Sequence, residues 1–445
     1  MPTPPRPSQR WQRRITRALI FAQLLGAVGL AAGGTAGALL AQDLTGSAKA
    51  AGMPLAALVL GSGIGAVAVT RLMDRAGRRV GLCAAYVGGA LGAATAVAAA
   101  GLRNWSLLLV GSLLLGCGNA AVMLARYAAA DVAARPARAI STVVAAASVG
   151  AVAGPNLLGP SGGMARILGL PEPAGLFLLA MPAFAGAALV LTVLLRPDPL
   201  RLATAGLRTD RIGTGTPARR PSGATLAAVF GDPRIRLALV VLAFANLTMV
   251  AMMAVAPVHL HDHGAGMGLV GLMVSVHIAA MYLPSPLTGW LADRYGSRAV
   301  IHAGAVLLLC AGVSAAMAGP SRIAVMVPLM LLGIGWNAGL IGGSALLREA
   351  LLAPSSRSHA EGLGELGMGA AAAVGGGGAG PLMATGGFGL LGLVAAVPCL
   401  LTIVAVLASA AGQHRVMRPA AAMRTRRPTD LEPNDDRRGF ADRLV

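Results

Sequence analysis

The sequence predicts an all-α integral membrane protein with twelve transmembrane helices, arranged as two six-helix pseudo-repeat halves around a central cavity. Hydrophobic residues make up 56% of the 445 residues and charged residues only 12%, about half the charged share of an ordinary soluble domain. Apolar runs of about 20 residues, the length that crosses a bilayer, recur along the whole chain. A short charged motif also occurs once in each half.

The apolar runs define the elements in order. We expect spanning helices at 16–41, 52–71, 80–101, 105–128, 138–160 and 174–195, and then at 236–259, 266–290, 299–318, 321–347, 360–384 and 386–411. Polar segments rich in Arg and Pro separate and follow these two sets, which is typical of loops and disordered tails. The predicted domains are an N-terminal half 1–195, a cytoplasmic linker 196–235, a C-terminal half 236–411 and a disordered cytoplasmic tail 412–445.

The basic residues predict the orientation. Of the 36 Lys and Arg, only Lys49, Arg103, Arg166 and Arg322 fall in the loops that are external if the N-terminus is inside. Cytoplasmic loops carry the excess of Lys and Arg, so both termini are predicted to be cytoplasmic and the chain to be multi-pass in the plasma (inner) membrane, with the lipid bilayer as a partner. The net charge of +19 does not indicate nucleic-acid binding, because no aromatic residues interleave with the arginines to stack bases.

A charged motif follows the second helix of each half. The segment 70–79 reads TRLMDRAGRR, and the segment 289–298 reads GWLADRYGSR. The repeat extends further, since Asn119 lies 12 residues before Asp131 and Asn337 lies 12 residues before Glu349. The two segments resemble the G-x-L-a-D-r-x-G-R-R signature of the major facilitator superfamily. The first copy has Thr70 where Gly is usual and also departs at Met73, and the second has Ser297 where Arg is usual.

This resemblance implies a transporter that works by alternating access, with the substrate bound between two parallel repeats near the midplane. It also implies a cytoplasmic latch in which Asp74 caps the N-terminus of the eleventh helix and Arg78 reaches Asp131. The alternative is that these residues only fix the topology and solvate a loop. The latch set is Asp74, Arg75, Gly77, Arg78, Asp131, Asp293, Arg294, Gly296, Arg298 and Glu349.

The fifth helix carries Gly150, Gly154, Pro155 and Gly159. This pattern resembles the g-x-x-x-G-P-x-x-G-G motif of exporters in the same superfamily, with Leu158 in place of one glycine. Proline removes a backbone donor, so the segment can bend, and the alternative is a passive kink. With the overall resemblance to drug/proton antiporters, the motif favours export of small amphipathic or drug-like molecules.

Polar residues inside a membrane are costly and therefore mark candidate functional positions. The proton-coupling candidates are Glu365, Glu361, Arg126 and His277. The two glutamates can instead stabilise a helix N-terminus, and Arg126 can snorkel to the interface. Because the chain has no G-x-x-x-x-G-K-[ST] nucleotide loop, we expect H⁺ rather than ATP to drive transport.

The candidates for lining the substrate cavity are polar or flexible residues within the predicted helices: Gln23, Asn119, Asn246, Met249, Met253 and Asn337. Met273, His277 and Met281 of the eighth helix extend this set. Methionine is flexible and polarisable, which suits an adaptable pocket, but a methionine stripe also serves plain packing. The histidines of segment 259–263 are predicted to lie in an interfacial loop rather than to bind a metal.

The function that these patterns favour is secondary export of a small molecule, coupled to H⁺. An importer of a metabolite or nutrient with the same fold remains an alternative, and a membrane sensor or scaffold is the alternative outside transport. We expect a monomer without enzymatic activity, cofactor or metal, because no nucleophile–base or ligand cluster lies at one membrane depth. The four cysteines fall in apolar runs without C-x-x-C spacing, so they indicate neither disulfides nor a zinc site.

Overall fold

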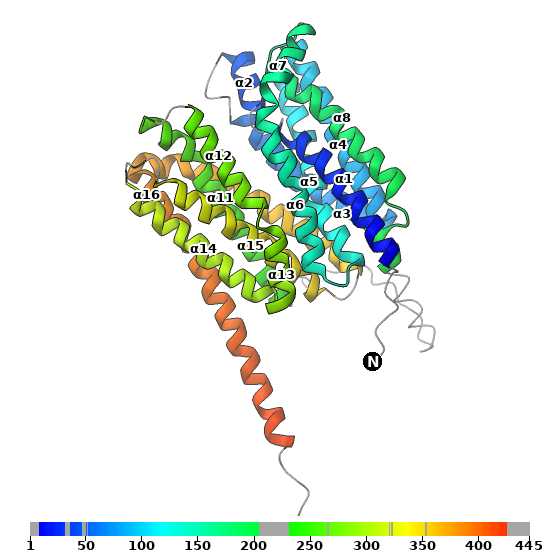
Figure 1. The fold of residues 1–445 in the computed structure, drawn as a ribbon, viewed down its shortest axis with the longest axis vertical. Coiled ribbons are helices and arrows are strands. Elements are labelled where there is room, and N and C mark those ends of the chain that lie inside the picture. Colours follow the sequence, from blue (N-terminus) through cyan, green and yellow to red (C-terminus); the bar gives the residue numbers. More distant parts are fainter. Residues whose placement is uncertain are drawn as a thin grey trace, which may run out of the picture.

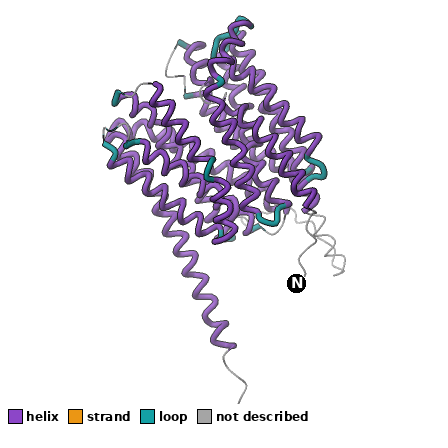
Figure 2. Tube along the Cα trace, viewed as in Figure 1, coloured by secondary structure: helices purple, strands orange, loops and turns teal. Residues whose placement is uncertain are grey.

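The computed structural model describes residues 9–31, 36–46, 50, 52–203, 231–264, 267–319, 321, 324–351 and 354–424. Within these ranges the regular structure is helical and strands are absent (Figures 1 and 2). The first half contains α1 (Gln9–Ala31), α2 (Gly37–Thr45), α3 (Met53–Ala76), α4 (Arg78–Gly101), α5 (Trp105–Val132), α6 (Pro136–Asn156), α7 (Leu158–Ile167) and α8 (Ala174–Leu194).

The second half begins after the linker. It contains α11 (Pro233–Asp262), α12 (Met267–Tyr282), α13 (Ser285–Tyr295), α14 (Ser297–Met317), α15 (Met326–Ala350) and α16 (Pro354–Arg424). The helix α16 includes a break at Gly386 and Gly387, where φ and ψ leave the helical range. The break falls at the boundary predicted between the last two spanning helices, so α16 makes two passes.

Eight of the described helical segments are each long and apolar enough to cross a membrane. The remaining passes are interrupted helices: α1 continues as α2, α6 as α7, and α12 as α13. The last of these breaks coincides with Pro284 and Pro286, whose rings cannot continue a helical hydrogen-bond ladder. Counting each pair once and α16 twice gives twelve passes within the described part of the chain, which confirms the predicted fold class.

The loop motif of each half makes a one-residue connection. Gly77 joins α3 to α4 with φ of 99°, and Gly296 joins α13 to α14 with φ of 89°. A residue with a Cβ is strained at such angles, so glycine is required at both positions. The sharp connection places the residue after each glycine, Arg78 or Ser297, at the first position of the next helix.

Two predicted boundaries need correction. The helix α16 continues to Arg424, so residues 412–424 are helical where a disordered tail was predicted. A helix that extends an existing one has no nucleation cost, and the alanines at 420–422 favour its continuation. The first linker residues, 196–203, also lie against the first half, where the side chain of Asp198 accepts a hydrogen bond from the Arg79 backbone. The linker residues 204–230 and the tail residues 425–445 lie outside the described part.

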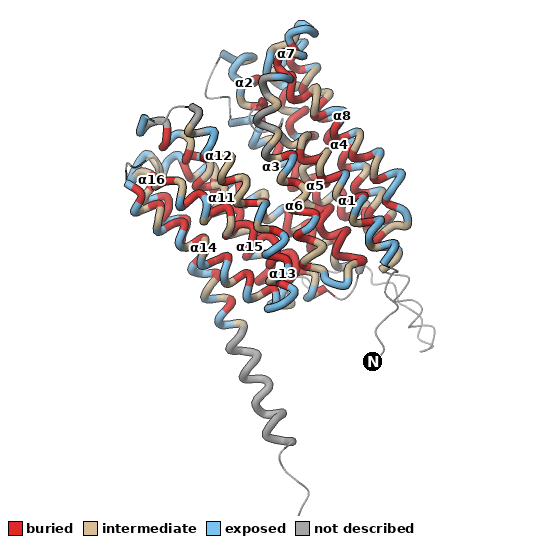
Figure 3. Tube along the Cα trace, viewed as in Figure 1, coloured by how far each residue is buried: buried red, intermediate tan, exposed pale blue. Residues whose placement is uncertain are grey.

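The buried apolar residues form two clusters, each made mostly of one half with a few residues of the other, and large apolar side chains also cover the outer surface (Figure 3). Exposed examples are Leu91 on α4, Leu189 on α8 and Leu401 on α16. An outer surface of this kind is suited to lipid rather than water. The halves meet where α3 packs along α16 and where α6 packs against α12 and α13.

Candidate functional site

A fully buried arginine joins the two halves at the end of α3 and the start of α4. The Nε of Arg78 lies 2.8 Å from Oδ2 of Asp131, which is at the end of α5. The other two guanidinium nitrogens of Arg78 donate to both carboxylate oxygens of Glu361 in α16, at 2.5 and 2.9 Å. Arg348 of α15 completes the group, with Nη2 3.6 Å from Oδ1 of Asp131. Two arginines and two carboxylates therefore balance in charge, which offsets the cost of their burial.

The loop aspartates each face the first turns of a helix from the other half. The Oδ2 of Asp74 lies 2.8 Å from Nδ1 of His359 near the start of α16. The Oδ2 of Asp293 accepts a hydrogen bond from the backbone N–H of Arg138 near the start of α6, at 3.3 Å, and lies 3.7 Å from the Arg138 side chain. A carboxylate at a helix N-terminus is favoured by the helix dipole.

A second buried ion pair lies deeper in the bundle. The Nη2 of Arg126 on α5 donates to Oε1 of Glu365 on α16 at 2.6 Å, and both residues are almost fully buried. The Nε of Arg126 donates to Oγ of Ser344 on α15 at 3.0 Å. The Tyr127 hydroxyl donates to the same Ser344 oxygen and its ring lies under the guanidinium, with 4.6 Å from Cζ to the ring centroid. The carboxylate of α16 is thus held by a group from the other half.

The repeat shows where this pair lies. Arg126 and Ser344 are 218 residues apart, the same separation as that of Asn119 from Asn337 and of Asp131 from Glu349. Arg126 and Ser344 are therefore equivalent positions of the two halves. Equivalent residues of two related units touch only near the axis that relates the units. Arg126 consequently lies at the pseudo-two-fold axis, on the boundary between the halves.

The second-half loop has different partners from the first. Ser297, at the position equivalent to Arg78, donates its hydroxyl to Oε1 of Glu349 at 2.5 Å. This bond stays within the second half. Arg75 and Arg294, the basic residues that follow the two loop aspartates, are exposed. The structure therefore brings Arg78 and Asp131 of the predicted latch into one network, pairs Asp74 with His359, and keeps Glu349 apart from the network.

The polar cavity candidates make hydrogen bonds within their own halves. The Nδ2 of Asn119 donates to Ser62 at 2.9 Å, and Gln23 donates to the Val122 carbonyl at 3.2 Å. Asn337 donates to the Met281 carbonyl and accepts from Thr288, and Asn246 donates to the Met368 carbonyl. These contacts fasten neighbouring helices, because buried amides need partners.

The methionine candidates lie in the apolar core of the second half. Met273 and Met281 are buried in it, while Met249 and Met253 are partly buried and pack against it. His277 is buried too, and its Nδ1 lies 2.8 Å from the Leu329 carbonyl. These positions agree with packing, the alternative that the sequence left open for the methionine stripe.

The glycine motif of the fifth helix contributes to packing and to an interruption. A Cβ at Gly150 would contact Ala27 at 2.5 Å, so this glycine allows α1 and α6 to approach closely. Gly154 and Pro155 lie in the last turn of α6, and Gly159 lies at the start of α7, beyond a turn at Leu157. Proline favours such a break because it lacks a backbone donor.

Several residues of the network were not predicted from the sequence: Tyr127, Arg138, Ser344, Arg348 and His359. Ser344 had a usable signal, because its separation from Arg126 equals that of the other repeat pairs. Arg138, Arg348 and His359 had none, since their partners are brought close only by the packing of one half on the other.

Comparisons with known proteins agree with this architecture. The family model described as Major Facilitator Superfamily matches residues 19–266 and residues 237–435. The uncharacterized MFS-type transporter YddS of Bacillus subtilis (strain 168) is 37% identical over 410 residues, which cover 91% of this chain and 92% of YddS. The riboflavin transporter RfnT of Brucella anthropi is 30% identical over 357 residues, 79% of this chain and 84% of RfnT. The structure of the proton:xylose symporter XylE is similar with a TM-score of 0.68 at 16% identity, covering 89% of this chain and 95% of XylE.

Proposed function

The chain belongs to the major facilitator superfamily, and on this premise we propose that it is a secondary active exporter in which Glu365 exchanges a proton. The observation that carries the proposal is the buried pair of Arg126 and Glu365, which joins the halves at their pseudo-two-fold axis. Alternating access requires the halves to separate on one side and then on the other. A titratable group that holds them together can couple that motion to protons.

The distribution of contacts supports a conformation that is closed at the cytoplasmic end. Among the described residues, polar contacts join segment 74–138 of the first half to segment 293–365 of the second. In the proposed orientation all of them lie between the cytoplasmic end and the centre of the bundle. These contacts must break before the substrate site opens to the cytoplasm, so we assign this structure to a state that is closed on the cytoplasmic side.

Protonation of Glu365 would remove the charge that holds Arg126. The freed guanidinium would then favour an anionic or polar group of the substrate in its place. Return of the carboxylate would release that group and close the pair again. Tyr127, which belongs to the same helix as Arg126 and contacts its Nη2, can keep the guanidinium in position when Glu365 releases it.

The substrate class and direction rest on different grounds. The glycine and proline motif of α6 and α7 supports export of small amphipathic molecules. The 30% identity to a riboflavin transporter supports the alternative, a carrier of a planar, polar metabolite.

We propose a monomer in the plasma membrane with both termini cytoplasmic. Reporter fusions test the orientation: a fusion after Leu260 should read external and one after Pro217 cytoplasmic.

The decisive experiment compares Glu365→Gln with Glu361→Gln in proteoliposomes. An imposed pH gradient drives the flux of riboflavin or ethidium, and entrapped pyranine reports proton movement. Glu365→Gln should abolish accumulation driven by the gradient yet retain exchange of the probe across the membrane, because glutamine can hold Arg126 but cannot carry a proton. Glu361→Gln should have the milder effect on coupling. Accumulation at the wild-type rate in Glu365→Gln would place the proton path elsewhere, with His277 the next candidate.

A further inference from the structure

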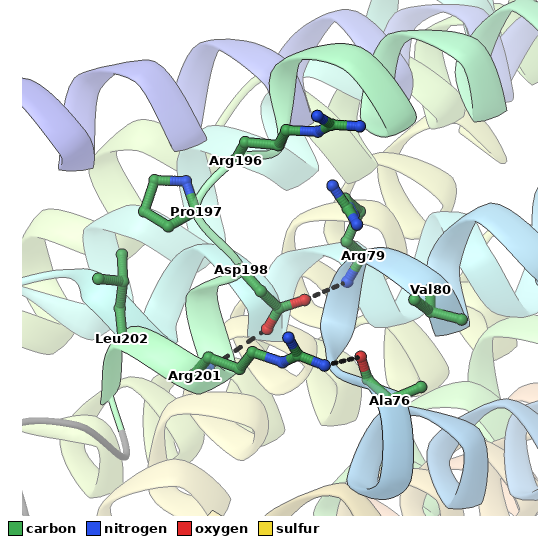
Figure 4. A pocket seen from close by; sticks show the side chains of 8 residues that line it. All are labelled: Ala76, Arg79, Val80, Arg196, Pro197, Asp198, Arg201 and Leu202. Carbon is green, nitrogen blue, oxygen red and sulfur yellow. Dashed lines mark hydrogen bonds between the residues drawn. The ribbon is translucent and has the colours of Figure 1, made fainter.

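A basic pocket lies at the end of the first half, away from the buried charge network. Its volume is about 400 Å³. It is formed where α3 meets α4 and where the chain leaves α8 (Figure 4). Its lining contains three arginines and one aspartate among apolar residues: Ala76, Arg79, Val80, Arg196, Pro197, Asp198, Arg201 and Leu202. Nothing in the proposed transport cycle uses this pocket.

The single carboxylate of the pocket is occupied by the backbone. Asp198 accepts hydrogen bonds from the N–H groups of Arg79 at 2.8 Å, Leu200 at 3.0 Å and Arg201 at 3.3 Å. A Cβ at Gly77 would lie 2.5 Å from its Oδ2, so the carboxylate also packs tightly on the loop. Asp198 therefore builds the pocket wall, and three arginines against one aspartate leave an excess of two positive charges there.

The arginine side chains are positioned by contacts of their own. The Nε of Arg196 donates to the Thr192 carbonyl at 3.2 Å, and Nη2 of Arg201 donates to the Ala76 carbonyl at 3.4 Å. In Figure 4 the guanidinium groups of Arg79 and Arg196 extend to the same side of Asp198. Guanidinium groups retain several donors after one contact, and their planar forks suit the oxygens of a phosphate.

An apolar surface leads from the pocket along the bundle. Val80 lines the pocket, and Val87 and Leu91 follow it at i+7 and i+11 on the same face of α4, all exposed. On α8, which packs against α4, Leu189 and Val193 precede Arg196 by seven and three residues and are also exposed. The positive pocket thus stands at one end of a strip that faces the acyl chains.

We propose that this pocket binds the phosphate group of an anionic phospholipid of the cytoplasmic leaflet, with its acyl chains lying on the strip between α4 and α8. Basic pockets between helices on the cytoplasmic side suit such headgroups. A free phosphate shares the headgroup chemistry but makes no use of the apolar strip. The site touches transport through the loop, because Arg78 lies between the two loop residues that contact Asp198 and itself holds Glu361.

The test measures lipid binding to the purified full chain by native mass spectrometry. The delipidated protein is titrated with phosphatidylglycerol or phosphatidylcholine, with and without inorganic phosphate. The pocket variant is Arg79→Gln/Arg196→Gln/Arg201→Gln. The matched control, Arg71→Gln/Arg135→Gln/Arg234→Gln, removes three arginines that are exposed at the same end of the bundle but lie outside the pocket.

The wild type and the control variant should bind phosphatidylglycerol more tightly than phosphatidylcholine. The pocket variant should lose this preference, by about 5-fold per arginine and roughly 100-fold in total. Arg196→Gln alone should reduce the preference for phosphatidylglycerol by about 5-fold. Because this residue is exposed and lies just after the end of α8, the single variant keeps the test valid if the triple variant misfolds. Equal loss in both triple variants would overturn the proposal, because the preference would then follow net charge alone. Displacement of the lipid by millimolar phosphate would overturn the lipid assignment in favour of a free anion.

Discussion

The two loops that connect α3 to α4 and α13 to α14 share a motif but close the bundle differently. In the first, Arg78 is fully buried and bonds carboxylates of both halves. In the second, Ser297 bonds Glu349 of its own half, and Asp293 reaches Arg138 at 3.7 Å with the Arg138 side chain 38% exposed. A buried pair loses far more when one partner is removed than an exposed pair does. We therefore expect the interface of α3 and α16 to limit how readily the two halves separate at this end of the bundle. The interface of α6 and α13 should contribute less.

The largest effect should come from removing the arginine that distinguishes the two interfaces. In Arg78→Gln, Asp131 and Glu361 remain buried without their main partner, at a cost of about 3–5 kcal/mol. We expect a lower thermal unfolding midpoint and loss of probe transport. The counterpart Arg138→Gln removes an exposed contact worth about 0–1 kcal/mol. Similar losses in both variants would mean that the interfaces are equivalent.

A triple variant distinguishes the cost of burying unpaired charges from the cost of losing the hydrogen bonds of Arg78. Arg78→Gln combined with Asp131→Asn and Glu361→Gln removes both buried carboxylates together with their main partner, and leaves Arg348, whose side chain is 11% exposed. Stability should recover in this variant, measured by the same unfolding midpoint, while transport stays impaired. No recovery would indicate that the geometry of the bonds, and not their charge balance, holds the interface.

The sequence predicted the helices well and their long-range contacts poorly. A bilayer requires about 20 apolar residues in each span, so the apolar runs were readable locally, whereas the one-residue connections at Gly77 and Gly296 were not predicted. The partners of Arg78 and Arg126 in the other half, Glu361 and Glu365, are 283 and 239 residues away. Their pairing depends on how the halves pack, which no local pattern encodes. Asn119 and Asn337 were recognised as polar from the sequence. Polarity alone, however, does not distinguish a residue that hydrogen-bonds neighbouring helices from one that lines a cavity.

The second effect concerns close packing at equivalent places in the two interfaces. In the first interface Thr70 of α3 faces Gly362 of α16, and in the second Gly289 of α13 faces Ser141 of α6. The glycine thus lies on α16 in the first interface and on α13 in the second, but the two helices approach each other closely in both. Gly362→Ala and Gly289→Ala should each cost about 1–3 kcal/mol through overpacking, seen as a lower unfolding midpoint.

Each glycine variant has a matched rescue. Thr70→Gly should restore Gly362→Ala, because it removes the side chain that the new methyl group meets. Ser141→Gly should restore Gly289→Ala only in part, because the Ala137 carbonyl oxygen would still lie 2.9 Å from the new methyl group. Exchanging the rescues should restore neither. Rescue by the wrong partner would show that the loss did not come from the contact.

A smaller effect is expected at the loop aspartates. Asp74→Asn and Asp293→Asn each weaken an interaction with the first turns of a helix, worth about 0.3–1 kcal/mol for an exposed carboxylate and up to about 2 kcal/mol in a partly buried site. Transport should fall more in Asp74→Asn, because the same interface also contains Arg78 and His359, while membrane insertion stays near normal in both. A larger loss in Asp293→Asn would reverse the ranking of the two interfaces.

The smallest effect, and the sharpest test of the comparison, is at Ser297. Its hydroxyl bonds Glu349, whose side chain is exposed at the bundle end and can turn to water when the bond is lost. Ser297→Ala should therefore cost no more than about 1 kcal/mol.

Ser297→Arg places a guanidinium where the first half has Arg78, next to Glu349 at the position equivalent to Asp131. It cannot complete the network, since Ile140 stands at the position equivalent to Glu361, by the separation of 221 residues that relates Arg138 to His359 and Ser141 to Gly362, and offers no carboxylate from the other half. We expect Ser297→Arg to leave both the unfolding midpoint and the transport rate close to wild type, whereas Ser297→Arg combined with Ile140→Glu should make this end of the bundle harder to open and slow transport. If Ser297→Arg alone slowed transport, an arginine at this position would act without a partner in the other half, and the asymmetry of the interfaces would not depend on the link from Arg78 to Glu361.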